Sequence, residues 1–376
     1  MGQTVCQLQK EAEKQQTAHE ELIRGGDGRR EGLFQIKNQV LHRVSEIPLK
    51  YGVDQCVGDT LCTGCIMYGQ RVIAAMLDFC RDIREVSEPG AIMLNYSNPN
   101  AMATWACNKY GKVRTIGLCH GEIHGEMQIA EVLGIPREEL DIVCAGINHQ
   151  TWYISVKHHG KDMLDQILPG FLKHEKYREE EKVRIDILKR FGYYSTESNG
   201  HLSEYVAWYR KRPDEIKDWI DLSNWIHGET GGITNLPDEC VVEVPCYVDG
   251  NGISVPKVGD LPLGCAAVCS QSIWVQKLAV QAAVHGDVNL LKQAALMDPL
   301  TGAVCNPPEI WQMIDEMLVA QEEWLPQYTE AIRQAKERLQ SGPLIPTKEG
   351  YRGAVRLREK TAEEVAAEHE KRKITV

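Results

Sequence analysis

A cysteine and a histidine at the ends of two apolar runs are the side chains of this sequence best suited to binding a metal ion. Cys119 follows the run VRTIGL at 113–118, and His149 follows LDIVCAGI at 140–147. A thiolate and an imidazole together suit a divalent transition metal that keeps open positions for a substrate. A simpler interpretation of the same pair is a small buried cysteine and a loop histidine without chemistry.

A second group of reactive side chains lies in GHLSEY at 200–205. Within about one helical turn, His201, Glu204 and Tyr205 offer a base, an acid and a phenol, the groups that general acid–base catalysis uses. The alternative is that all three belong to the protein core. This short stretch therefore supplies candidates for proton transfer.

The other cysteines and histidines give weaker evidence for a metal or redox site. Cys62 and Cys65 have the C-x-x-C spacing of zinc sites and redox pairs, but no second such pair follows at zinc-ribbon spacing. We therefore expect free cysteines there. We expect His158 and His159 to lie at the end of a strand and to face solvent.

Alternating helix and strand patterns position the first set of residues. The period of the apolar residues predicts helices over 70–85, 99–109 and 125–135, and strands over 91–97, 113–118, 140–147 and 151–158. Asn98 before Pro99 is a typical helix start, with Asn as the cap. Helices between strands predict an α/β, Rossmann-like doubly wound parallel sheet. Ligands bind at the carboxyl ends of such strands, where Cys119 and His149 lie.

The second half of the chain has a different character. Residues 161–230 are predicted to be mostly helical, residues 238–262 have strand composition with an Asp-Gly-Asn-Gly turn, and 268–297 and 308–340 are again helical. This pattern predicts a mixed α+β C-terminal domain.

The composition is that of a globular protein. The chain has 376 residues, 43% hydrophobic and 25% charged, and its net charge of -11 argues against nucleic acid as a partner. No apolar run reaches the roughly 18 residues that span a membrane, and the N-terminus has no secretory signal pattern. Thirteen scattered cysteines fit reduced thiols in the cytoplasm.

The first strand and the glycine-rich phosphate turn of a nucleotide-binding fold are not found in residues 1–33. We therefore divide the chain into an atypical segment (1–33), a remnant of a dinucleotide-binding domain (34–158), a substrate, metal and oligomerisation domain (159–340) and a charged tail (341–376). The sheet would lack its first strands, and its exposed edge predicts a homo-oligomer.

Several motifs together resemble glycoside hydrolase family 4. They are IPLKYGVDQCVGDT (47–60), LNYSNPNAMATW (94–105), GLCHG (117–121), AGINHQTWY (145–153), GHLSEYVAWYRK (200–211), ITNLPDECVVEVP (233–245) and AALMDPL (294–300). The resemblance covers about residues 33–330. It implies a glycosidase in which NAD oxidises the sugar at C3, a base removes the C2 proton, and a divalent metal, usually manganese, stabilises the enediolate before elimination.

The resemblance also implies roles for single residues. Cys119 and His149 would bind the metal, and Asn98 and Asn148 would bind the sugar hydroxyls. The other implied residues are Asp59 as a catalytic group, Thr60 and Arg71 as substrate contacts, Asn95 as a cofactor contact, and His201 or Tyr205 as the base.

His120, next to the metal cysteine, resembles family members that act on unphosphorylated α-glycosides, and we expect galactose ahead of glucose or glucuronic acid. Without the glycine-rich turn, this chain alone is expected to bind NAD weakly and to show little or no glycosidase activity. Two alternatives remain open, a catalytically inactive, truncated family member and a 2-hydroxy-acid dehydrogenase.

Overall fold

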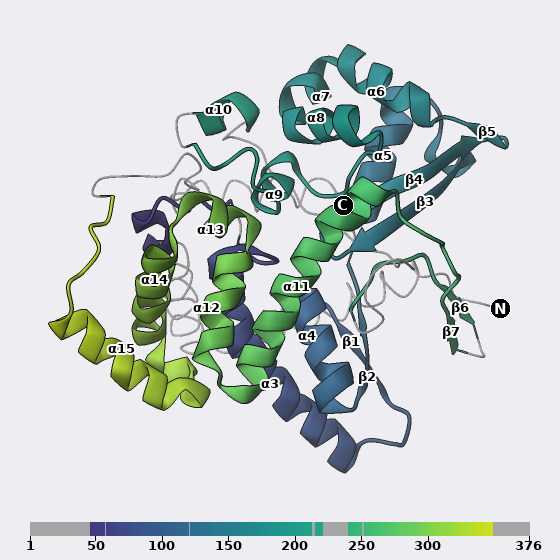
Figure 1. Cartoon of the computed structure of the whole chain (residues 1–376). Coiled ribbons are helices and arrows are strands. Elements are labelled where there is room, and N and C mark those ends of the chain that lie inside the picture. Colours follow the sequence, from purple (N-terminus) through teal and green to yellow (C-terminus); the bar gives the residue numbers. More distant parts are fainter. Residues whose placement is uncertain are drawn as a thin grey trace, which may run out of the picture.

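The computed structural model describes residues 46–56, 58–119, 121–212, 215–220, 240–249 and 252–348 (Figure 1). The α-helices in these ranges are α3 (Cys62–Val86), α4 (Asn100–Ala106), α5 (Gly121–Leu133), α6 (Leu164–Lys173), α7 (Glu175–Glu180), α8 (Lys182–Phe191), α9 (Asn199–Glu204), α10 (Ile216–Trp219), α11 (Leu263–His285), α12 (Val288–Met297), α13 (Pro299–Val304), α14 (Pro307–Ala320) and α15 (Thr329–Ser341). The strands are β1 (Ile92–Asn95), β2 (Arg114–Gly117), β3 (Leu140–Ile147), β4 (Gln150–His158), β5 (Lys161–Asp162), β6 (Tyr247–Asp249) and β7 (Gly252–Ser254). Shorter helical turns are η1 (Cys107–Gly111), η2 (Arg137–Glu139), η4 (Glu322–Trp324) and η5 (Pro326–Tyr328).

The parallel unit predicted for the first half of the chain is present in β1, α4 and β2. The two strands pair in parallel from Ile92↔Arg114 to Asn95↔Gly117, and α4 with η1 forms the crossover. At the carboxyl end of β1, the buried Asn95 side chain donates to Thr104 Oγ1 at 3.1 Å and accepts from Ser97 Oγ at 2.8 Å. These bonds fix the turn into α4. They place Asn95 in the framework of the unit, so its role as a cofactor contact stays a prediction.

The prediction that residues 140–147 add a third parallel strand is wrong for the described structure. β3 pairs antiparallel with β4 in a separate sheet of order β3-β4-β5, with Ile147 opposite Gln150. Only Asn148 and His149 link the two strands, and a two-residue link can join antiparallel neighbours but not parallel ones, which need a crossover of a dozen or more residues.

Two helix starts differ from those expected. α3 begins at Cys62 rather than at residue 70, because its first turn is already apolar and buried. Cys62 and Cys65 lie in that turn as buried free thiols, which confirms the prediction of unpaired cysteines. The predicted Asn98 cap of α4 is wrong: Pro99 is the N-cap residue, and the Asn98 amide points to Asp59 instead.

The helical part of the C-terminal half is organised around α11, which runs through the centre of Figure 1 with α12 beside it. Small buried residues such as Cys265, Cys269 and Ala279 let α11 approach α3 and α4 closely. Near β4, Cys269 Sγ lies 3.4 Å from the Gln150 carbonyl, and Ser272 Oγ donates to Gln150 Oε1 at 3.0 Å. α11 therefore supports the chain directly after His149.

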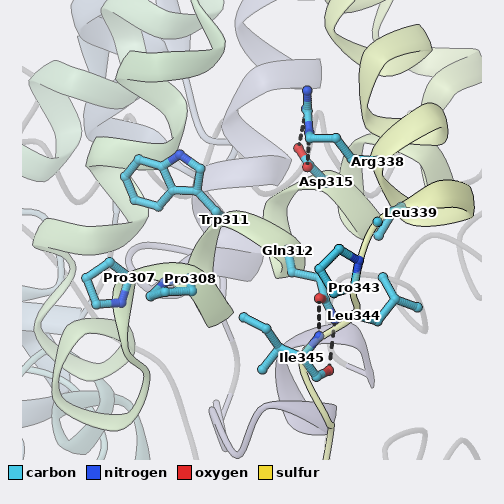
Figure 2. A pocket seen from close by; sticks show the side chains of 11 residues that line it. Pro307, Pro308, Trp311, Gln312, Asp315, Arg338, Leu339, Pro343, Leu344 and Ile345 are labelled. Atoms are coloured by element: carbon cyan, nitrogen blue, oxygen red, sulfur yellow. Dashed lines mark hydrogen bonds and ion pairs between the residues drawn. The ribbon is translucent and has the colours of Figure 1, made fainter.

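The predicted hairpin within 238–262 is present as β6 and β7, although residues 250 and 251 of its turn lie outside the described residues. The first residues of the predicted charged tail contact α14. Gln312 on α14 bonds the backbone of Ile345 in both directions, at 3.1 and 2.7 Å, and the segment 342–345 borders an apolar groove along α14 (Figure 2). None of the helices in the described ranges is long and apolar enough to cross a membrane.

Candidate active site

The turn between β3 and β4 brings His149 to the cysteine that follows β2. Cys119 Sγ and His149 Nε2 lie 3.7 Å apart, and both residues are buried. His149 has a left-handed backbone with φ 63°, which the two-residue turn requires and which a β-branched residue would resist. The pair predicted from two separate apolar runs is therefore assembled in the fold.

The other nitrogen of His149 determines which way the ring faces. Nδ1 contacts Thr60 Oγ1 in a short hydrogen bond, lies 3.3 Å from Tyr205 Oη, and is 3.9 Å from Asp59 Oδ1. With oxygen acceptors around Nδ1, the proton belongs on that nitrogen, and the Nε2 lone pair then points toward Cys119. Metal-binding histidines are usually oriented in this way by their second nitrogen.

The donor set fits a divalent transition metal. Typical metal–sulfur and metal–imidazole bonds, at tetrahedral or octahedral angles, place the sulfur and nitrogen roughly 3.1–3.6 Å apart. The observed 3.7 Å between Cys119 Sγ and His149 Nε2 is close to this range. The turn thus offers two ligands and leaves further coordination positions for other groups.

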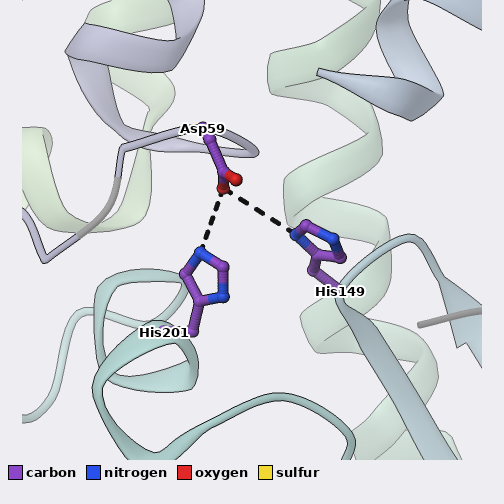
Figure 3. Close-up of side chains that lie close together, drawn as sticks. All are labelled: Asp59, His149 and His201. Carbon is purple, nitrogen blue, oxygen red and sulfur yellow. Dashed lines mark hydrogen bonds and ion pairs between the residues drawn. The ribbon is translucent and has the colours of Figure 1, made fainter. Parts of the chain in front are cut away.

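Asp59, His149 and His201 form another cluster whose ligand atoms lie within 4.8 Å of one another (Figure 3). His201 is, however, already bonded through both nitrogens, from Nε2 to Asp59 Oδ1 at 3.0 Å and from Nδ1 to Glu197 Oε2 at 2.8 Å. An imidazole that donates to two carboxylates keeps no lone pair for an ion. The pair of Cys119 and His149 is therefore the better candidate for binding an ion than this cluster.

His201 is held as a buried cation. Burial alone would lower its pKa, but the charge and hydrogen bond of Asp59, followed by those of Glu197, raise the pKa of His201 well above its usual value. Although burial opposes it, the nearby imidazoles of His149 and His201 and the hydrogen bond from His201 lower the pKa of Glu197, which stays ionised. The side chains of Glu197, His201 and Asp59 thus form a buried chain of alternating charges.

Glu197 was not among the residues predicted from the sequence. It precedes His201 by four residues, and its backbone is left-handed with φ 76°, at the turn into α9. A carboxylate four residues before a candidate histidine is a detectable signal, but it is common on ordinary helix surfaces. Only the packing shows that the Glu197 side chain is fully buried.

Glu204, weighed as an acid, has another role in the structure. Its carboxylate accepts from the backbone N–H groups of Cys56, at 2.5 Å, and Gly58, at 3.1 Å. These bonds hold the segment that carries Asp59 and Thr60. Burial raises the pKa of Glu204.

Asp59 is the centre of the polar network. Its Oδ2 accepts from Asn98 Nδ2 at 2.7 Å, and its Oδ1 accepts from Thr60 Oγ1 at 3.1 Å as well as from His201. The Asp59 side chain is 19% exposed, while that of His201 is fully buried. Asp59 therefore connects the buried histidine to the open side of the site, with Asn98 beside it.

Asn148 carries a buried side-chain amide whose hydrogen bonds are unsatisfied within the described structure. The residue is 3% exposed, and neither amide atom has a hydrogen-bond partner within the described structure. A buried amide without partners costs about 1–3 kcal/mol, so such a group is stabilised when a ligand supplies the missing bonds. Asn148 directly precedes His149, which puts this unsatisfied amide beside the Cys119–His149 pair.

The remaining predicted residues have mixed outcomes. Tyr205 contacts His149, and burial, followed by the charges of Asp59 and Glu197, raises the pKa of Tyr205 well above its usual value. Arg71 is not drawn into this network in the described structure; its guanidinium bonds Gln321 and the Met67 carbonyl. His120 lies outside the described residues.

The chain matches a known family over most of its length. Residues 33–135 match the family described as Family 4 glycosyl hydrolase, and residues 144–230 and 226–301 match its C-terminal domain. An α-galactosidase of Rhizobium meliloti is 49% identical, over 87% of this chain and 79% of that protein. An α-galactosidase of Bacillus subtilis is 31% identical, over 75% of this chain and 78% of that protein.

Solved structures share the fold. A 6-phospho-α-glucosidase from gut microorganisms, in complex with NAD and Mn²⁺, has a TM-score of 0.60 at 18% identity, over 76% of this chain and 79% of that one. A 6-phospho-β-glucosidase from Thermotoga maritima has a TM-score of 0.58 at 21% identity, over 76% of this chain and 78% of that one. At this level of identity the similarity supports the Rossmann-like fold predicted from the sequence.

Proposed function

The chain belongs to family 4 of the glycosyl hydrolases, and from this premise we propose that it hydrolyses an unphosphorylated α-galactoside. Family membership decides against the 2-hydroxy-acid dehydrogenase alternative. The choice of an α-galactoside rests on the two α-galactosidases that cover most of the chain. The expected role of His120 in choosing an unphosphorylated sugar belongs to this proposal, since that residue lies outside the described structure.

The observation that carries the proposal is the unsatisfied amide of Asn148 beside the Cys119–His149 pair. The two ligand atoms of the pair lie 3.7 Å apart, and the buried Asn148 amide lacks partners among the described residues. A sugar offers vicinal hydroxyls, which can bind a metal ion and an amide at the same time. Asn98, next to Asp59, is the second amide that we assign to the sugar.

We assign a divalent metal, Mn²⁺, to Cys119 Sγ and His149 Nε2. When bound, this ion supplies Lewis-acid stabilisation for negative charge that develops on the sugar oxygens. Thr60 and Tyr205 keep the His149 ring in the orientation that this binding needs. Thr60 thus acts on the metal ligand rather than on the sugar, a change from its expected role.

The two candidates for the base are unequal. His201 donates from both nitrogens to carboxylates, so it is a proton donor and a source of positive charge. Tyr205 is the better base, but burial and the nearby carboxylates keep its pKa high, so it needs added positive charge to lose its proton. We therefore propose Tyr205 as the base, with Asp59 and His201 arranging the charge around it.

NAD is proposed as the second cofactor on the strength of the family and of the fold. Within the described ranges the parallel sheet has two strands, and no glycine-rich phosphate turn precedes them. These residues do not by themselves form a dinucleotide site, so we derive no step through NAD.

The test is a substrate panel with the full chain in NAD, Mn²⁺ and a reducing agent. The proposal predicts hydrolysis of p-nitrophenyl α-galactoside in preference to the α-glucoside, the α-glucuronide and the 6-phospho-glycosides. Preference for a phosphorylated sugar would overturn the proposed substrate class. No turnover of any substrate, with Mn²⁺ shown to bind, would favour the inactive family member instead.

We further propose that the protein works in the cytoplasm as a homo-oligomer. No disulfide joins any two cysteines of the described ranges, which supports a reducing compartment. Ile92 and Leu94 on β1 are 40% and 51% exposed, and apolar side chains on a strand of a two-stranded sheet favour association. Light scattering tests whether the protein is a homo-oligomer, and a stable monomer at high concentration would contradict that proposal.

A further inference from the structure

A second group of metal-binding side chains lies at the open end of the β3–β4 hairpin. His158 Nε2 is 3.0 Å from Glu139 Oε2, and His159 Nε2 is 3.7 Å from the same oxygen. The two imidazole rings have centroids 4.1 Å apart. Three ligand atoms from these residues lie within 4.8 Å of one another.

The backbone explains why successive histidines face one partner. Neighbouring residues of a strand normally point to opposite sides of the sheet. His159, however, follows the last residue of β4 and has a left-handed φ of 49°, which turns its ring back beside that of His158. Glu139 ends η2 directly before Leu140, the residue paired with His158, so its carboxylate reaches both rings.

We propose that Glu139, His158 and His159 form a second, surface site for a divalent metal that prefers imidazole, such as Zn²⁺. Tetrahedral bonds of typical length place neighbouring nitrogen and oxygen ligands roughly 3.3 Å apart. The two observed separations, 3.0 and 3.7 Å, lie on either side of this value. Three protein ligands leave one position for water or for another group.

The site differs in kind from the Cys119–His149 pair. Its side chains are 27%, 75% and 44% exposed for His158, His159 and Glu139, so they can adjust to an ion at little cost. It offers no sulfur, and two imidazoles with one carboxylate suit Zn²⁺, Ni²⁺ or Cu²⁺ better than Mn²⁺. An ion here would join η2 to the end of β4 without contacting the catalytic residues.

The chain contains a matched control in another histidine near a carboxylate. His174 Nε2 lies 3.3 Å from Glu131 Oε1, and His174 is 25% exposed, similar to His158. Its Nδ1 accepts from the Tyr177 backbone N–H at 3.2 Å. This pair has one imidazole, too few ligands for a comparable site, so His174→Ala should leave metal binding unchanged.

The experiment is a Zn²⁺ titration of the full-length, untagged chain against a chromophoric chelator. Wild type should bind two ions, one at each site, and His159→Ala and Glu139→Gln should each weaken one of them by more than roughly tenfold, since even outer-shell losses cost 10–100-fold. Cys119→Ser should weaken the other ion, and His174→Ala should weaken neither.

Co²⁺ spectra identify which ion is lost. Cobalt at Cys119 has a sulfur-to-metal charge-transfer band, whereas cobalt at the surface site has none because that site lacks a thiolate. His159→Ala should therefore keep the charge-transfer band while it binds one ion fewer. Equal stoichiometry and affinity in wild type, His159→Ala and Glu139→Gln, all folded by circular dichroism, would overturn the proposal.

Discussion

Two clusters in this molecule contain the same three groups, two imidazoles and a carboxylate, but they are built for different chemistry. In the buried cluster of Asp59, His149 and His201, the two histidines are 1% and 0% exposed. In the surface cluster of Glu139, His158 and His159, every member reaches solvent. The difference lies in what surrounds the three groups.

Each buried histidine has its Nδ1 atom held by a hydrogen-bond partner outside the cluster. Glu197 accepts a hydrogen bond from Nδ1 of His201, and Thr60 and Tyr205 contact Nδ1 of His149. These partners fix which nitrogen carries the proton, and the low dielectric strengthens each interaction. Similar residue types therefore give an oriented, charged site in the interior and an adaptable ion site at the surface.

The largest difference between the clusters should appear on loss of His149. His149→Ala removes a metal ligand and the partner of Thr60 and Tyr205, so kcat/KM should fall by about 10³-fold or more, at the upper end of the effect of one catalytic group. Circular dichroism checks that the variant folds. Activity within tenfold of wild type at saturating Mn²⁺ would contradict the catalytic role given to the buried cluster.

Glu197→Gln should have the next largest effect, because it keeps a hydrogen-bond acceptor for His201 but removes one charge. We expect kcat to fall by roughly 10–100-fold, and the pKa of His201 to fall with it. The matched change at the surface, Glu139→Gln, should leave kcat unchanged.

The pH dependence of stability gives Glu197→Gln a second measurement. The pKa of His201 is raised on folding, so its charge stabilises the fold at low pH, and this contribution is lost as pH rises through the folded-state value. In wild type the loss therefore begins near about pH 6.5, the usual pKa of histidine, and continues up to the raised folded-state value. In Glu197→Gln the folded-state pKa of His201 should be lower, so the loss should be smaller and should end at a lower pH, which a plot of Tm against pH measures. Identical Tm profiles would mean that Glu197 does not control the charge of His201.

A smaller effect on catalysis, but a large one on stability, is expected for a residue that supports the buried cluster. Arg210 is fully buried and bonds both the Asp54 carbonyl, at 2.5 Å, and the Asp54 carboxylate, at 3.1 Å, near the segment that carries Asp59. Arg210→Met removes the guanidinium partner of a buried carboxylate, which costs about 3–5 kcal/mol of unfolding free energy. Urea denaturation measures this, and a loss below 1 kcal/mol would contradict the assigned role.

The smallest effect is expected at the surface cluster. His158→Ala should change the unfolding free energy by less than about 1 kcal/mol in the absence of metal, as is usual for exposed ion pairs. Its kcat/KM should equal that of wild type. A loss of activity comparable to that of His149→Ala would show that the two clusters are not independent.

The local elements were largely predictable, whereas their assembly was not. The apolar period found β1, β2, β3 and β4, and the Asp-Gly-Asn-Gly turn found the β6–β7 hairpin. The antiparallel pairing of β3 with β4 was missed, because three strands in a row with helices between the first ones suggested a continuing parallel sheet. The two-residue link of Asn148 and His149 is too short for a parallel crossover, so it already indicated antiparallel pairing.

The site was predictable where it follows strand ends and not where it depends on packing. Cys119 and His149 follow two predicted strands and do lie close together, although the parallel pairing on which that prediction rested holds only for β1 and β2. Glu197 and the role of Glu204 in holding the backbone of Cys56 and Gly58 depend on contacts between distant segments. Spacing carries no information on which carboxylates a fold buries.

The most direct test of the central claim is the Mn²⁺ dependence of p-nitrophenyl α-galactoside hydrolysis, measured with NAD present for wild type, Cys119→Ser and His158→Ala. The account predicts that wild type and His158→Ala are activated along the same curve. Cys119→Ser should need more than roughly tenfold more Mn²⁺, since a metal ligand is lost. If Cys119→Ser follows the wild-type curve, the catalytic metal is not held by Cys119 and His149, and the account is wrong.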